Sequence, residues 1–220
     1  ARIADNIGVI SELEKQKPGC VDRLSQEFGI KDFARYPLEL LLTQDANRNN
    51  KDDPYGIIMY ARSDHNGAMY QISGALEELH RSLHGGYQIR VMEYDGKPQF
   101  GRKLLELRKR YGNEHKISFA LVTEHGSKSR LGNLIFARQL EKKRVRRVTD
   151  FFEKDATIIL ASCSTGKPYG IGQGLSETLG MRVIAPDDPT SVNALHAEVK
   201  EGKLKFSIEY NMAQAQEYFE

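Results

Sequence analysis

Two short stretches decide the fold of this chain: ISFALVTEHG at residues 117–126 and TIILASCSTG at residues 157–166. Each is an apolar run that breaks into polar residues and a glycine. Apolar runs of this length without alternation are typical of strands buried on both faces, as in parallel sheets. Further strands are expected at residues 55–61, 87–94 and 182–185, and helices at 68–84, at 100–110 and from about Ile171. This alternation predicts an α/β domain with a central, mainly parallel sheet covered on both faces. A last alternating run, residues 204–210, predicts an edge strand.

The first fifty residues have a different pattern. Apolar residues recur there at helical spacing, with an interruption at Pro18-Gly19, which predicts short helices. The stretch DANRNNKDDP at residues 45–54 is polar and rich in Asn and Asp, so it predicts a loop or linker. We therefore expect a small helical segment with a linker over residues 1–50 and the α/β domain over residues 51–220.

Composition limits the function classes. The chain has 220 residues, of which 40% are hydrophobic and 28% charged, and a net charge of +2. That charge does not favour nucleic acid as a partner, and no apolar run approaches the roughly 20 residues of a membrane-spanning helix. Two cysteines, Cys20 and Cys163, make no disulfide framework or metal pattern, which favours a reducing compartment. We expect a cytoplasmic protein or a secreted effector that acts in such a compartment.

The chemistry is expected where the two deciding strands end. Reactive groups in open α/β sheets gather at the carboxyl ends of the strands, and here His125 follows one strand and Cys163 the next. A thiol is mostly protonated at neutral pH, and a neighbouring imidazole activates it by taking its proton. Gly126 allows its backbone N–H to approach a substrate carbonyl, and the Cys163 N–H is the natural second donor of an oxyanion hole. Cys20 has no histidine nearby in sequence, so a structural role is expected for it.

The pair His-Gly after one strand and Ser-Cys after the next resembles the clan of caspase-like cysteine peptidases, which includes caspases, legumains, clostripains, gingipains, separases and toxin autoprocessing domains. The segment IILASCSTG followed by GIGQGLSETLGMRVIAPDD is most similar to bacterial members. The resemblance covers about residues 55–188. It implies a caspase-like three-layer sandwich and an endopeptidase with His125 as general base, Cys163 as nucleophile, and the N–H groups of Gly126 and Cys163 as oxyanion hole. It also implies a protein or peptide substrate and no required cofactor.

Two departures from the clan leave the subfamily and the specificity open. Ser162 stands before the cysteine, where an acidic residue or alanine is common, and a long basic segment separates His125 from Cys163. The pocket beside the cysteine is lined in this clan by the loops after the first and fifth strands. Here Arg62 could pair with an acidic P1 side chain, whereas Asp187 and Asp188 could pair with Arg or Lys; we favour the acidic pair and a basic P1 residue.

The basic segment allows three interpretations: a solvated surface, a binding site for a polyanion, or a loop cut during self-processing. Some toxin autoprocessing domains of this clan are switched on by inositol hexakisphosphate, which makes such a polyanion a candidate activator. The residues concerned are Lys142, Lys143, Arg144, Arg146 and Arg147.

Other chemistries fit the sequence less well. The loop after Cys163 lacks the glycine of a Walker motif and the arginine of a tyrosine-phosphatase loop, and the glycines at residues 170–174 are a weak dinucleotide pattern. The remaining histidines, His65 among them, lack the neighbours of a zinc site, so we expect no metal. The competing hypothesis is a catalytically inactive caspase-like module that binds a polyanion or a protein partner.

Overall fold

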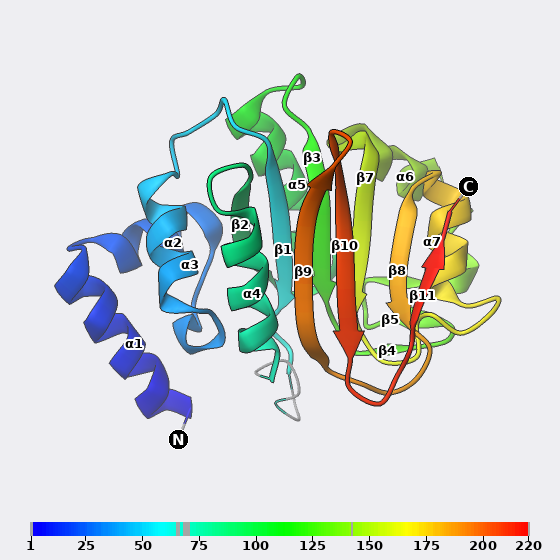
Figure 1. Ribbon diagram of the computed structural model, residues 1–220, viewed down its shortest axis with the longest axis horizontal. Helices are drawn as coiled ribbons and strands as arrows, with labels where there is room; N and C mark the ends of the chain where they lie inside the picture. Colours follow the sequence, from blue (N-terminus) through cyan, green and yellow to red (C-terminus); the bar gives the residue numbers. More distant parts are fainter. Residues whose placement is uncertain (1, 65–66, 68–70, 142, 220) are drawn as a thin grey trace.

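The computed structural model describes residues 2–64, 67, 71–141 and 143–219, and its centre is one six-stranded sheet (Figure 1). The strand order is β11-β8-β7-β3-β1-β2, in which all neighbours are parallel except β11 and β8. The strands are β1 (Tyr55–Ala61), β2 (Gln88–Tyr94), β3 (Ile117–Thr123), β7 (Phe152–Ala161), β8 (Arg182–Pro186) and β11 (Ala215–Tyr218). The expected mainly parallel α/β sheet is confirmed.

Side chains on the two faces of the sheet pack against different layers. Ala120 and Val122 of β3 face a layer formed by α5 (Gly96–Tyr111), α7 (Ile171–Leu179) and the short α6 (Lys143–Arg146). Phe119 points to the opposite face, because successive side chains of a strand alternate. There α4 (Ser73–Leu83) packs beside a hairpin of β9 (Val192–Lys200) and β10 (Lys203–Tyr210) (Figure 1). The arrangement has three layers.

The prediction of an edge strand over residues 204–210 is wrong in its placement. The run forms β10, but it pairs with β9 in a separate antiparallel hairpin, and β11 takes the edge of the central sheet. The hairpin lies on the sheet because Phe206 packs against Phe119, with ring centroids 5.2 Å apart, and the Tyr210 hydroxyl donates to the Leu160 carbonyl at 2.8 Å. Alternation of buried and exposed residues reveals a half-buried strand but not its partner.

The N-terminal helices lie beside β2 at the other edge of the sheet (Figure 1). They are α1 (Arg2–Gln16), α2 (Cys20–Phe28) and α3 (Leu38–Ala46), with a 3-10 turn, η1 (Phe33–Arg35), before α3. The Gln44 side chain donates to the Val91 carbonyl at 3.0 Å and accepts from the Val91 N–H at 2.8 Å. It therefore satisfies backbone groups that an edge strand would otherwise expose.

The loop expected over residues 45–54 begins later than predicted. Helix α3 continues through Ala46, and the Asp45 side chain is fully buried. Its carboxylate pairs with Lys17 at 2.8 Å and with Arg23 at 2.7 Å. A charged residue can be buried when it is paired, and this one ties α1, α2 and α3 together.

Candidate active site

The structure brings His125 and Cys163 to one pocket. Strands β3 and β7 are hydrogen-bonded neighbours in which Thr123 pairs with Ala161, so the residues that follow them leave the sheet at the same edge. Both residues line a pocket of about 30 Å³. The rest of the lining comes from Ile72, Thr123, Glu124, Ala161, Ser162, Thr190, Ser191 and Val192.

Gly126 lies directly against the turn that carries the cysteine. A Cβ on this residue would be 2.8 Å from the Cys163 carbonyl oxygen and 3.0 Å from the Ser162 Cβ. Gly126 also begins the small strand β4 (Gly126–Ser127), which pairs with β5 (Arg130–Leu131). This close approach of backbone to backbone explains the need for glycine at this position.

The register between β4 and β5 directs the Gly126 N–H away from β5. The Gly132 N–H donates to the His125 carbonyl at 2.6 Å, so the next pair, Gly126 and Leu131, is a non-hydrogen-bonded pair of the antiparallel ladder. In such a pair the N–H groups point away from the partner strand. The N–H of Cys163 donates to none of the described residues. The Gly126 N–H thus points away from β5, and the Cys163 N–H has no acceptor among the described residues.

Asp64 is a site residue that the sequence analysis missed. Its carboxylate Oδ1 lies 3.6 Å from Nε2 of His125, and its side chain is fully buried whereas that of His125 is 27% exposed. The residue follows the carboxyl end of β1, which is the neighbour of β3 in the sheet. An acidic residue just after the strand adjacent to the histidine's strand is the signal that could have found it.

Glu124 is a second buried carboxyl at the pocket. Its Oε1 accepts from the His125 N–H at 2.9 Å, and its Oε2 accepts from the Tyr94 hydroxyl at 3.2 Å. Burial raises the pKa of the Glu124 carboxyl above its ordinary value, although these hydrogen bonds favour the ionised form. Glu124 therefore holds the backbone of His125 in place from inside the protein.

The cysteine is held in a tight turn and is half-buried. Its thiol donates to the Thr190 carbonyl oxygen, with Sγ and oxygen 3.7 Å apart. The flanking hydroxyls of Ser162 and Thr165 are 3.0 Å apart, and the Ser164 N–H donates to the Asp188 carbonyl at 3.1 Å. Cys163 is consequently fixed from β7 on one side and from the loop after β8 on the other.

Asp187 and Asp188 differ in what they contact. The Asp187 carboxylate accepts from the Gln214 N–H at 2.9 Å and from Gln216 Nε2 at 3.3 Å, so it fixes the chain entering β11. The Asp188 carboxylate is exposed and lies 3.7 Å from the Lys167 ammonium. Of the two, Asp188 is the one whose carboxylate faces solvent beside the cysteine turn.

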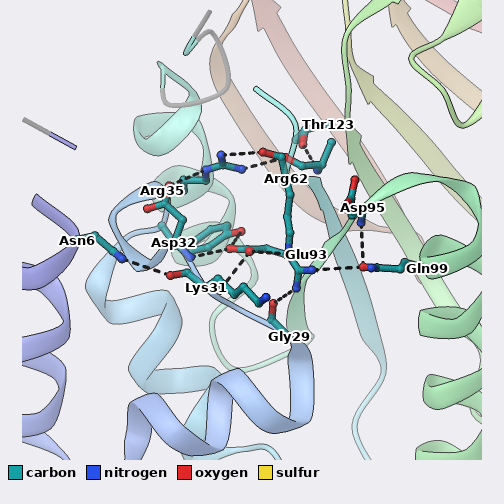
Figure 2. A network of polar contacts seen from close by, with 12 residues as sticks. Asn6, Gly29, Lys31, Asp32, Arg35, Arg62, Glu93, Asp95, Gln99 and Thr123 are labelled. Carbon is teal, nitrogen blue, oxygen red and sulfur yellow. Dashed lines mark hydrogen bonds and ion pairs between the residues drawn. The ribbon is translucent and has the colours of Figure 1, made fainter. Parts of the chain in front are cut away.

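The structure places Arg62 away from the pocket that His125 and Cys163 line. Its guanidinium donates to the Gly29 carbonyl at 2.7 Å, to Glu93 at 3.3 Å and to Gln99 at 3.4 Å (Figure 2). The backbone N–H of Arg62 donates to the Tyr94 carbonyl. The side chain thus joins β1 to β2 and to the end of α2.

Glu93 is the centre of that network (Figure 2). Its buried carboxylate accepts from the N–H groups of Lys31 and Asp32 at 3.2 and 3.1 Å and from the Tyr36 hydroxyl at 3.0 Å. Arg35 donates to the carbonyls of Ala61 and Arg62 at the end of β1. The N-terminal segment is therefore bonded to the carboxyl ends of β1 and β2, on the side of the sheet where the site lies.

The basic segment forms α6 and a following 3-10 turn, η4 (Arg147–Phe151). The side chains of Lys143, Arg146 and Arg147 are exposed, and Val145 is buried beneath them. Arg144 lies in α6, and Lys142 lies outside the described residues, as does His65. The exposed cations are available to solvent.

Cys20 is fully buried in the N-terminal helices. Burial raises the pKa of its thiol to about 11, and the nearby Asp45 carboxylate acts in the same direction. A thiol of this kind stays protonated near neutral pH. Cys163 is the more accessible of the two cysteines.

The sequence was compared with protein-family models and with curated proteins. A family model described as a domain of unknown function (DUF8616) matches residues 101–204, a little under half of the chain, and this match includes both His125 and Cys163. No curated protein matches the sequence. Among the described residues, no helix is long and apolar enough to cross a bilayer. Over the same residues, no three His, Cys, Asp or Glu side chains gather as a metal site would require.

Proposed function

We propose that this protein is a cysteine endopeptidase of the caspase-like clan, with Cys163 as nucleophile and His125 as general base. The observation that carries the proposal is the shared pocket at the carboxyl edge of β3 and β7, lined by both residues. The Asp64 carboxylate, 3.6 Å from Nε2 of His125, adds to it, because an imidazole that accepts a proton during catalysis is stabilised by a nearby carboxylate.

Before the reaction, the thiol of Cys163 donates a hydrogen bond to the Thr190 carbonyl oxygen. His125 then takes the proton as Sγ attacks the peptide carbonyl carbon. The tetrahedral intermediate collapses with loss of the amine, which receives the proton from His125, and leaves a thioester on Cys163. A water molecule, deprotonated by His125, releases the carboxylic acid and restores the thiol.

The oxyanion of both tetrahedral intermediates needs donors that are aimed before the reaction starts. The N–H groups of Gly126 and Cys163 are the proposed pair. Two observations support this assignment: the ladder register directs the Gly126 N–H away from β5, and the backbone of Gly126 lies close to that of Cys163.

For the substrate, we propose a basic P1 residue that pairs with Asp188. The Asp188 carboxylate is exposed and its loop is bonded to the cysteine turn, whereas that of Asp187 is occupied by Gln214 and Gln216. The Arg62 guanidinium is bonded to Gly29, Glu93 and Gln99, which disfavours it as a receptor for an acidic P1 residue.

A peptide library with mixed P1 residues tests the proposal. The wild-type protein and Cys20→Ala are expected to cleave after Arg or Lys, whereas Cys163→Ala and His125→Ala lose at least 100-fold in kcat/KM. Mass spectrometry of the purified proteins tests for self-cleavage in the basic segment. Such cleavage is expected in the wild type and absent in Cys163→Ala and His125→Ala. Cleavage that persists in Cys163→Ala contradicts the proposal. Absence of cleavage, together with salt-sensitive binding of inositol hexakisphosphate, supports the inactive binding module instead.

A further inference from the structure

A cavity of about 210 Å³ lies between the sheet and the layer that contains α5, α6 and α7. Its floor includes Ala120 and Val122 of β3, and its roof includes Leu104 of α5 and Leu175 of α7. Among the described residues of the lining, Lys97 alone has a polar side chain; the rest are apolar or glycine. The cavity is on the opposite face of the sheet from the β9–β10 hairpin, and its lining includes neither His125 nor Cys163.

The chemistry of this lining selects an apolar occupant. A buried water needs two to four polar partners, which a wall of this kind does not supply, and apolar protein cavities of about 150 Å³ bind benzene or xenon. The wall is also preformed, because Ala120, Val122 and Leu104 belong to regular elements and are buried. Ala120, with its single methyl group, leaves room in the middle of the floor.

The opening of the cavity is marked by its more exposed residues. Gly101 is exposed and Lys97 and Val148 are half-buried, which places the opening between α5 and η4. Lys97 donates to the Gln139 amide oxygen at 3.4 Å, and exposed Arg147 precedes Val148 in η4. Lys97 therefore places a positive side chain at the rim of an apolar interior.

We infer that this cavity binds a small anionic amphiphile: an alkyl or aryl carboxylate whose apolar body occupies the cavity while its carboxylate pairs with Lys97 at the rim. The apolar body and the carboxylate of this ligand are bound for different physical reasons. The apolar body is favoured by burial against the cavity wall, and the carboxylate by a cation that remains in contact with solvent.

Calorimetric titration with octanoate tests the inference, and Cys163→Ala protein keeps the measurement independent of any peptidase activity. Octanoate is expected to bind at one site and acetate not to bind. Lys97→Met should weaken octanoate at least tenfold and octanol less than twofold, while Lys15→Met on α1 changes neither. Absence of saturable octanoate binding, or equal effects of Lys97→Met and Lys15→Met, overturns the inference.

A cavity-filling variant locates the bound chain. Ala120→Leu adds side-chain volume in the floor and should abolish binding of both octanoate and octanol while the thermal midpoint stays equal or rises. Leu179→Ala enlarges the same cavity and should tighten decanoate relative to octanoate; it keeps the test decisive if Ala120→Leu does not fold. Unchanged octanoate affinity in folded Ala120→Leu, or an unchanged decanoate preference in Leu179→Ala, shows that the chain binds elsewhere.

Discussion

The backbone of Gly126 contacts the backbone of Cys163 so closely that a Cβ at Gly126 would lie 2.8 Å from the Cys163 carbonyl oxygen. The contact joins the loop after β3 to the turn after β7. A backbone atom cannot move aside as the end of a flexible side chain can. Gly126→Ala is therefore expected to push the two loops apart.

We expect Gly126→Ala to lower the free energy of unfolding by about 1–3 kcal/mol, the usual cost of overpacking a close contact. Peptidase activity should fall further than stability explains, because the Gly126 N–H is a proposed oxyanion donor. Urea unfolding and kcat/KM measure the two effects. Gly74→Ala, at an exposed glycine of α4 with no atom within 4 Å of the added Cβ, is the matched control. Equal behaviour of the two variants contradicts the prediction.

Asp64→Asn is expected to reduce kcat on the order of 100-fold with little change in KM, because the amide no longer stabilises protonated His125. A loss confined to kcat separates this role from a defect in substrate binding, which would raise KM. Asp150→Asn, on exposed η4, is the control for loss of a carboxylate. A kcat equal to that of Asp150→Asn, or a loss seen only in KM, would count against the role of Asp64.

The two cysteines should differ strongly toward iodoacetamide. Burial raises the pKa of the Cys20 thiol to about 11, so below about one part in a thousand is thiolate at pH 7.5. We expect native protein to label first at Cys163, as measured by peptide mapping at short times. Protein unfolded in urea should label at both positions, which controls for detection. Faster native labelling at Cys20 would argue against Cys163 as the reactive thiol.

Asp45 should make the protein sensitive to acid. Burial disfavours the ionised carboxylate, but Arg23 and Lys17 outweigh burial and lower the pKa of Asp45 from 3.8 to about 2. A lowered pKa in the folded state stabilises the protein above pH 3.8, and this contribution is lost as the pH falls toward 2. It amounts to about 2 kcal/mol at neutral pH.

Asp45→Asn should therefore be less stable than the wild type by about 2 kcal/mol at pH 7, and the difference should shrink to nothing near pH 2. Urea unfolding across this range measures it. Asp5→Asn, at an exposed position of α1, is the control for loss of a surface carboxylate. A difference between Asp45→Asn and wild type that is constant with pH contradicts the assignment.

Glu124 should change the stability with pH in the direction opposite to Asp45, because its pKa is raised in the folded protein. Because burial raises the pKa of its carboxyl above 4.5, the folded protein holds this proton more tightly than the unfolded chain. Stability is thus lost as the pH rises from 4.5 through the folded-state pKa. Glu124→Gln stays neutral and should flatten the stability curve over that interval, measured by urea unfolding. A curve parallel to that of the wild type would be inconsistent with this account.

The regular part of the fold could be predicted from local pattern alone. The ranges of β1 and β3 agree with the expected strands, because an uninterrupted apolar run between polar residues has well-defined ends. The expected neighbourhood of His125 and Cys163 followed from the same runs, since parallel strands carry their chain ends to one edge of a sheet.

What the sequence could not specify depends on contacts between distant residues. The pairing of Asp64 with His125, the burial of Asp45 and the packing of Phe206 in β10 against Phe119 in β3 each join segments that are separated in the chain. A polar stretch that contains aspartate predicts a loop. Burial of Asp45 becomes favourable only because folding brings Lys17 and Arg23 to its carboxylate. The sequence by itself determined the parallel strands of the central sheet, most of the helices, and the positions of His125 and Cys163 just after two neighbouring strands. Tertiary structure decided which carboxylate faces the histidine, because only packing fixes which of several acidic residues is brought within reach of the imidazole.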